Sequence, residues 1–146
     1  MKLTCFTDLG LRVLMYLTYQ ERKTLATITE ISEQFQISKN HLVKVVHFMA
    51  CRKWLVTTRG KGGGLALAKA PEDFLLGEVI RALEKDTEII DCNAPPCALR
   101  NYCQLKSILC EAENIFFDSL NRYTLRDATR SPTKETIVQL VKRWPE

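Results

Sequence analysis

Hydrophobic residues at the start of the chain repeat with the spacing of an α-helix. The stretch MKLTCFTDLGLRVLMYLTYQ is interrupted by Asp8 and Arg12, and no small-residue cleavage site follows it. This pattern predicts a helix rather than a signal peptide. No apolar run in the chain approaches the roughly 20 residues that are needed to span a bilayer. We therefore expect a cytoplasmic protein that does not insert into a membrane.

The next segment, TITEISEQFQISKNHLVKVVHFMAC, predicts two short helices. Thr27 and Glu30 have the Thr-x-x-Glu spacing of a capping box, which satisfies backbone donors at the start of the first helix. Ser38 fits the N-cap position of the second helix. The residues expected to face the core are Ile28, Ile31 and Phe35 in the first helix and Leu42, Val45, Val46 and Met49 in the second. Together the two helices predict a helix-turn-helix.

The outer face of the second predicted helix is polar, with Asn40, Lys44 and His47 at helical spacing. A helix of this kind fits the major groove of double-stranded DNA, where its N-terminal residues reach base edges and phosphates. The residues of this unit that we expect to contact DNA are Thr27, Ser38, Lys39, Asn40, His41 and Lys44.

After Trp54 the pattern changes from helical to alternating. The segments LVTT and LALA predict short strands, and RGKGGG between them is a turn that glycine makes possible. Because the turn carries two cations, it predicts a basic wing that follows the DNA backbone or enters the minor groove. A nucleotide-binding loop would need the Walker spacing, which is absent. The wing residues that we expect to contact DNA are Arg59, Lys61, Gly62 and Gly63.

The distribution of charge supports this interpretation. The formal net charge of the 146-residue chain is only +4, but the segment from Gln34 to Pro71 holds seven Lys and Arg and no Asp or Glu. The remaining 14 basic and 17 acidic residues give −3, so this acid-free segment carries the whole positive excess. Such a one-sided basic segment is typical of phosphate binding. A merely solvated basic face stays open as the alternative.

A longer amphipathic helix is predicted in QLKSILCEAENIFFDSLNRY. Its apolar stripe contains Leu105, Leu109, Ala112, Phe116, Ser119 and Tyr123, widened by Ile108, Ile115 and Leu120. A small winged helix cannot cover so long a stripe, so we expect it to form the seam of a homodimer with the first helix. Two winged helices on a twofold axis would read a pseudo-palindromic operator in DNA.

Four of the six cysteines fall in DCNAPPCALRNYCQLKSILC. Cys92, Cys97 and Cys103 are separated by four and five residues, and the double proline keeps this loop from becoming a helix. A reducing compartment favours metal or redox chemistry over disulfides. The spacing is looser than in structural zinc sites, and the lack of Cys-x-x-Cys weakens a thioredoxin-like redox role. Thiolates on a loop with room between them suit an iron-sulfur cluster. Zinc, redox thiols and inert cysteines stay open.

The other three cysteines have a simpler interpretation. Cys110 is the nearest candidate for a fourth ligand, but it lies one position off the apolar stripe of the long helix. Free cysteine packs well in cores. We therefore expect Cys110, and likewise Cys5 and Cys51, to be small buried residues rather than ligands.

The order of FTDLGLRVLMYL, ISKNHLVKVV, RGKGGGLALAK, LGEVIRALE, a three-cysteine loop and YTLRD resembles the winged-helix iron-sulfur cluster regulators of bacteria. The resemblance covers about residues 1–128 and is greatest to the nitric-oxide-sensitive repressors of this family. It implies one cluster per subunit, [2Fe-2S] or [4Fe-4S], held by Cys92, Cys97 and Cys103. It also implies that Asp8 of the partner subunit completes the coordination, whereas without the family Asp8 is an ordinary acid in a first helical turn.

The resemblance also implies a function. Nitric oxide would nitrosylate the cluster, release the tie between subunits and change the affinity for DNA. One alternative is a regulator of the same fold that senses iron-sulfur status, iron or superoxide. Another is a DNA-binding protein with a structural zinc site. A protein that uses the cluster for electron transfer would leave the basic segment without a purpose. We do not expect an enzyme, because His41 and His47 lie on the predicted DNA-binding face and the sequence shows no evident pairing of a nucleophile with a base.

The chain is thus expected to be mainly α with a small β-hairpin wing: a winged helix-turn-helix plus a long dimerisation helix. The DNA-binding domain is predicted over residues 1–85 and the cluster-binding loop over residues 86–103. The dimerisation helix and a short following helix are predicted over residues 104–128. For the tail, residues 129–146, a flexible segment and a packed amphipathic stretch after Pro132 both stay open.

Overall fold

The computed structural model describes residues 2–85 and 89–145. Residues 1, 86–88 and 146, which belong to the predicted DNA-binding domain, cysteine loop and tail, lie outside the described residues. The helices are α1 (Cys5–Tyr16), α2 (Ile28–Phe35), α3 (Lys39–Cys51), α4 (Leu76–Leu83), α5 (Gln104–Leu120), α6 (Leu125–Ala128) and α7 (Thr133–Arg143). The remaining elements are the strands β1 (Leu55–Thr58) and β2 (Gly64–Leu67) and the 3-10 helix η1 (Pro71–Asp73). The predicted fold class, mainly α with a hairpin wing, is confirmed.

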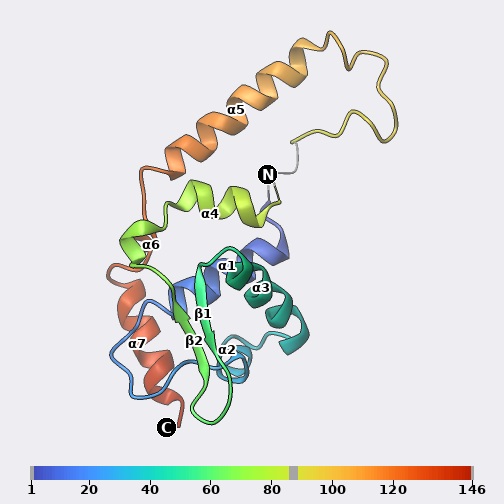
Figure 1. Ribbon diagram of the computed structural model, residues 1–146. Helices are drawn as coiled ribbons and strands as arrows, with labels where there is room; N and C mark the ends of the chain where they lie inside the picture. The colour runs from blue at the N-terminus through green and yellow to red at the C-terminus, as the bar shows by residue number, and fades with distance from the viewer. Residues whose placement is uncertain (1, 86–88, 146) are drawn as a thin grey trace.

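The core of the winged helix forms around α1, which packs against both α3 and α4 (Figure 1). Val13 and Leu14 of α1 are completely buried. All four residues of α3 that were predicted to face inward are buried as well. In the middle of α1, a Cβ atom at Gly10 would come within 2.9 Å of the terminal carbons of Leu83 in α4, so a larger residue there would force the Leu83 side chain to move.

The helix-turn-helix begins with the predicted capping box. The Thr27 hydroxyl accepts from the Glu30 amide at 3.1 Å, and the Glu30 carboxylate accepts from the Thr27 amide at 3.3 Å. The C-cap residue of α2, Gln36, adopts a left-handed conformation with φ 53°. Ser38 is the N-cap of α3 as predicted, but its side chain makes no capping hydrogen bond. The hydroxyl therefore remains available at the surface.

The wing is an antiparallel hairpin in which Leu55 pairs with Leu67 and Thr58 with Gly64. The observed β2 begins one residue before the predicted LALA segment. Gly60 and Gly62 have φ of 92° and 79°, a region that favours glycine. The turn therefore needs glycine for the reason that the sequence suggested.

α5 and the loop before it project away from the winged helix (Figure 1). α5 is anchored through α4, where Gly77 permits a close approach because a Cβ atom there would collide with the Phe117 carbonyl oxygen. The Arg81 guanidinium lies 4.2 Å from the centre of the Phe117 ring and donates to the Asn114 amide oxygen at 3.0 Å. The C-terminal half of α5 is thus fixed to the body of the protein.

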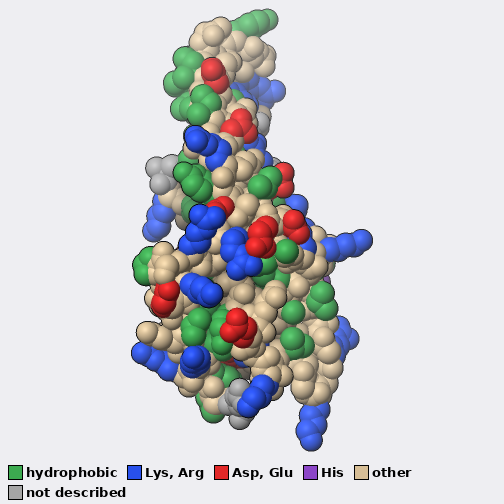
Figure 2. All heavy atoms as spheres, turned by 90° about the vertical axis from the view of Figure 1, so that its left-hand side faces the viewer, with side chains coloured by type: hydrophobic (Ala, Val, Ile, Leu, Met, Phe, Trp, Pro, Cys, Tyr) green, Lys and Arg blue, Asp and Glu red, His purple; other side chains and the backbone are tan. Residues whose placement is uncertain are grey.

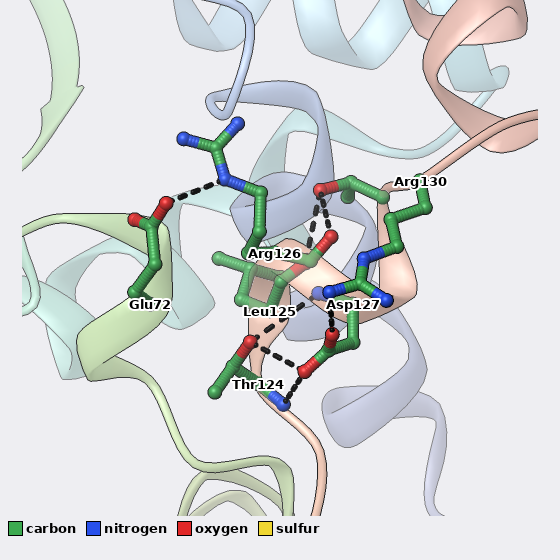
Figure 3. A network of polar contacts seen from close by, with 7 residues as sticks. Glu72, Thr124, Leu125, Arg126, Asp127 and Arg130 are labelled. Atoms are coloured by element: carbon green, nitrogen blue, oxygen red, sulfur yellow. Dashed lines mark hydrogen bonds and ion pairs between the residues drawn. The ribbon is translucent and has the colours of Figure 1, made fainter.

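The YTLRD segment ties the end of α5 back to the winged helix (Figure 3). Thr124 and Asp127 form a second capping box at the start of α6, and the Arg126 guanidinium meets the Glu72 carboxylate at 2.7 Å. The hydrogen bond from the Thr124 amide lowers the pKa of Asp127. Leu125 is 1% exposed and its amide donates to the Phe74 carbonyl at 2.9 Å. This segment therefore fixes where α5 leaves the core.

The segment after Pro132 forms α7, and its apolar face is packed. Ile137 and Val141 are buried and belong to the core cluster. Among the described residues, no helix has both the length and the apolar character that crossing a membrane requires.

Candidate nucleic-acid interface and cysteine loop

The outer face of α3 carries most of the predicted DNA contacts. Because the inward side is fixed by buried aliphatic residues, the opposite side must face solvent. The predicted contact residues of this face that are exposed are Ser38, Lys39, Asn40, His41 and Lys44. Thr27, at the start of α2, is half-buried and its hydroxyl oxygen is already used in the capping box. It can still donate its hydroxyl proton to a phosphate.

The wing presents the second part of this surface. Arg59, Lys61 and Gly62 are exposed. Gly63 differs from them, because it is half-buried and its amide donates to the Gly60 carbonyl oxygen at 2.9 Å. Gly63 therefore shapes the turn and has no spare amide proton for a phosphate.

The cations of the acid-free segment fall into two groups. Arg52 and Lys69 support the base of the wing: the Arg52 guanidinium lies 4.8 Å from the Phe48 ring centre, and the Lys69 ammonium donates to the Asp73 carbonyl at 2.6 Å. Within the described part of the chain, no acid pairs with the other five cations, which are Lys39, Lys44, Lys53, Arg59 and Lys61. Their charge is directed to solvent and can attract a polyanion.

A buried polar network, which the sequence did not reveal, connects α1 to α2. The Glu30 carboxylate is 1% exposed and accepts from the Tyr16 hydroxyl at 2.6 Å. The Arg22 guanidinium, from the loop between the two helices, donates to both Glu30 oxygens at 2.8 Å. Burial, together with the Glu30 bond, raises the pKa of Tyr16. The network fixes the position of the helix-turn-helix relative to α1.

A row of aromatic rings makes a second connection from α1. Phe6 meets Phe48 of α3 edge to face at 5.4 Å between ring centres, and Phe48 meets Trp54 at 6.4 Å. Aromatic pairs in this arrangement add stability beyond the area that they bury. The first turn of α1 is thereby joined to α3 and to the base of the wing.

Asp8 lies in that first turn of α1. Its carboxylate forms a two-pronged contact with Arg12 one turn along, with distances of 3.1 Å to Nε and 2.8 Å to Nη2. The Asp8 side chain is 49% exposed, so an approaching group can reach it from solvent. Any ligand role for Asp8 must compete with Arg12.

The three loop cysteines are free thiols but are not gathered into one site. Cys92 is buried, Cys97 is exposed and Cys103 is half-buried at the N-cap of α5. The Cys97 amide donates to the Cys92 carbonyl at 3.1 Å, which keeps their backbones close. In residues 2–85 and 89–145, no three Cys, His, Asp or Glu side chains lie close enough to share a metal ion. The donor set nevertheless fits iron-sulfur chemistry, because it offers three unpaired thiols on one non-helical segment.

The prediction that the remaining cysteines are buried is wrong for Cys5 and Cys51, which are both exposed. Cys110 is half-buried on α5. The error for Cys51 has a clear cause, because it lies on the same outer row of α3 as Asn40, Lys44 and His47. The tendency of cysteine to be buried cannot override the position of a residue on an amphipathic helix.

The apolar stripe predicted on α5 is largely exposed within this single chain. Leu105, Ile108, Ile115 and Tyr123 are exposed by 57%, 59%, 62% and 52%. Figure 2 shows hydrophobic side chains along the projecting part of the molecule, which α5 and the cysteine loop form. The loop adds two more apolar residues, Leu99 and Tyr102, which are 68% and 94% exposed. So large an apolar surface is typical of a protein-protein interface.

Comparisons with known proteins give a consistent picture. The Rrf2 family, described as an iron-dependent transcriptional regulator, matches residues 3–131. The chain is 41% identical over 145 residues to the HTH-type transcriptional regulator NsrR of Bacillus subtilis (strain 168), covering 97% of this chain and 98% of that protein. It is 41% identical over 130 residues to NsrR of Bacillus licheniformis, covering 87% and 91%. The T. potens IscR structure has the same fold, with a TM-score of 0.69, 21% identity and coverage of 88% and 85%.

Proposed function

This chain belongs to the Rrf2 family of transcriptional regulators, and we propose that it is a homodimeric repressor that senses nitric oxide through an iron-sulfur cluster. The resemblance to winged-helix regulators is confirmed, and regulation of transcription through DNA binding follows from the family. The signal, the cluster and the dimer are the proposal. The observation that carries it is that one chain has two features: a basic surface on α3 and the wing, both within the acid-free segment, and a loop with three unpaired thiols.

The residues on α3 and on the wing are proposed to have different roles in DNA binding. α3 enters the major groove, where Asn40 faces base edges while Lys39 and Lys44 face phosphates. The wing directs Arg59 and Lys61 to the backbone or the minor groove. These side chains are exposed, and no acid in residues 2–85 or 89–145 forms an ion pair with them, which supports this arrangement.

Exchanging Lys61 or Lys39 for Ala is expected to weaken binding to every DNA sequence alike. Each change should lower the slope of log affinity against log salt by about one, because one phosphate contact is lost. Asn40→Ala should instead change the sequence preference, at a cost of about 1–3 kcal/mol at one base pair. Fluorescence anisotropy on a selected operator and on unrelated DNA, at several salt concentrations, measures both effects.

Lys142→Ala is the matched control, since Lys142 is an exposed cation on α7 outside the acid-free segment. It should leave both the affinity and the salt slope unchanged. An equal loss of affinity on unrelated sequences for Asn40→Ala would contradict the base-reading role.

The sensing part assigns ligands to the loop and to α1. Cys92, Cys97 and Cys103 would hold the cluster with their thiolates, and Asp8 of the partner subunit would supply a carboxylate. When bound, the cluster supplies iron that reacts with nitric oxide. The carboxylate is the hardest of these four donors and the least suited to such iron. The Asp8 side chain should therefore detach first.

Arg12 gives the detached carboxylate a partner. In the structure it holds Asp8 through both oxygens. The same helix carries Phe6 toward α3 and Tyr16 toward Glu30 of α2. A shift of α1 would therefore move α3, the helix proposed to enter the major groove, as well. A 100-fold reduction in DNA affinity corresponds to a difference of only about 2.7 kcal/mol in binding free energy between the dimer with Asp8 bound to the cluster and the dimer with Asp8 detached. The loss of a few phosphate contacts supplies a difference of this size.

The test is an anaerobic visible spectrum with iron and sulfide assays, followed by operator binding before and after nitric oxide. We expect a brown protein whose bands bleach and whose affinity for the operator falls. Cys97→Ala should contain no cluster, yet its winged helix should stay folded. The matched control Cys51→Ala should keep the colour, because Cys51 lies outside the loop.

Other outcomes would point elsewhere. Retention of colour by Cys97→Ala would contradict the ligand assignment. A colourless protein with zinc would leave only the DNA-binding part of the proposal. If the cluster does not react with nitric oxide but responds to iron supply or superoxide, the proposed signal would be wrong, and the protein would be a regulator of the same fold with a different signal.

A further inference from the structure

A thiol and an imidazole lie together on the outer face of α3, in an element separate from the cysteine loop. The Cys51 sulfur is 3.6 Å from Nε2 of His47, and both side chains are exposed. Their four-residue spacing places them one turn apart on the same side of the helix. Cys51 therefore continues the row formed by Asn40, Lys44 and His47 toward the end of α3.

The surroundings of this pair are basic. Lys44 lies one turn before His47, and Arg52 and Lys53 follow Cys51 directly. The acid-free segment extends on both sides, so its own sequence places no carboxylate beside the thiol. A positive surface of this kind attracts small anionic reactants and stabilises negative charge that develops on sulfur.

We propose that Cys51 is a modification site for low-molecular-weight disulfides, with His47 as the group that accepts the thiol proton. The Cys51 sulfur attacks one sulfur of the disulfide, so that a new S–S bond forms while the original S–S bond breaks. The departing thiolate takes the proton from His47 and leaves as a thiol. Cys51 is oxidised and the leaving sulfur is reduced, so the exchange needs no other oxidant. Excess thiol reverses it.

The consequence for DNA binding follows from where the adduct would lie. Because Cys51 shares a row with Asn40 and Lys44, a group attached to its sulfur adds bulk and charge to the face that meets DNA. An anionic adduct would also repel the phosphates, whereas a cationic one would not. This consequence rests on the proposed function, but the reactivity of the pair does not.

The first experiment measures reactivity. The full-length chain is treated anaerobically with glutathione disulfide, and the modified peptides are quantified over time by mass spectrometry. Cys51 should react faster than Cys5, which is also exposed but has no imidazole within hydrogen-bonding distance among the described residues. His47→Gln should slow the reaction at Cys51 by about tenfold or more while leaving Cys5 unchanged. Equal rates at the two cysteines, or no effect of His47→Gln, would overturn the proposal.

The second experiment measures operator binding by the adducts. Glutathione attached to Cys51 should lower the affinity by about tenfold, and the cationic adduct formed from cystamine should lower it less. Cys51→Ala treated in the same way should show neither change, and dithiothreitol should restore the wild type. Unchanged affinity of the modified protein would refute the regulatory role. Failure of the untreated protein to bind any operator would refute the proposed function instead, while the rates of the first experiment would still test the pair.

Discussion

Replacing Glu30 by Ala is expected to lower the free energy of unfolding by about 3 kcal/mol, as measured by urea denaturation. Glu30 is 1% exposed and receives hydrogen bonds from Tyr16, from Arg22 and from the amide of Thr27. Removing the carboxylate leaves the Arg22 charge and the Tyr16 hydroxyl without their acceptor. The loss is at the lower end of the range for buried pairs, because the Arg22 side chain is 14% exposed and can turn partly toward water.

Two further variants distinguish the loss of the buried network from the general effect of removing an acid from α2. Tyr16→Phe should cost only about 1 kcal/mol, because Arg22 still satisfies the carboxylate. Glu33→Ala, at an exposed position of the same helix, should change stability by less than about 0.5 kcal/mol. A loss for Glu30→Ala no larger than that for Glu33→Ala would show that the network does not hold the two helices together. If Glu30→Ala does not fold, the comparison of Tyr16→Phe with Glu33→Ala still tests the network.

The contrast between the two parts of this network shows what sequence patterns can reveal. The Thr27–Glu30 capping box was predictable, because both residues belong to one helix turn and their spacing alone defines the motif. The burial of Glu30 was not, because its other partners come from α1 and from the loop after it. No local periodicity links Tyr16 or Arg22 to Glu30. Such contacts depend on how the helices pack.

The same distinction explains the other successes and errors. The predictions of the inward positions of α3 and of the glycine turn were correct, because helical spacing and positive φ are local properties. Cys51 was expected to be buried on the general behaviour of cysteine, although its position on the outer row of α3 already indicated exposure. For the loop, the sequence could identify three thiols as a set. Their relative placement depends on loop geometry, which spacing does not define.

A charge in the exposed stripe of α5 is expected to separate the proposed dimer. Ile115 is 62% exposed in the single chain and lies in the stripe with Leu105, Ile108 and Tyr123. If a second copy covers this stripe, Ile115→Asp places an unpaired carboxylate in an apolar interface, which costs several kcal/mol. The dissociation constant should rise at least 100-fold, which corresponds to about 2.7 kcal/mol. Sedimentation equilibrium measures it.

The variant should also lose affinity for a two-part operator, because each separated subunit can hold only one half-site. Ser107→Asp is the matched control: it adds the same charge to α5 at an exposed position on another face of the helix. It should leave both the dimer and the operator affinity intact. Since Ile115 is already exposed in the single chain, its replacement should not destabilise α5 itself, so unfolding measured under monomeric conditions should be unchanged. An Ile115→Asp protein that stays dimeric would place the seam elsewhere on the chain, and the cross-subunit role of Asp8 would then have no structural basis.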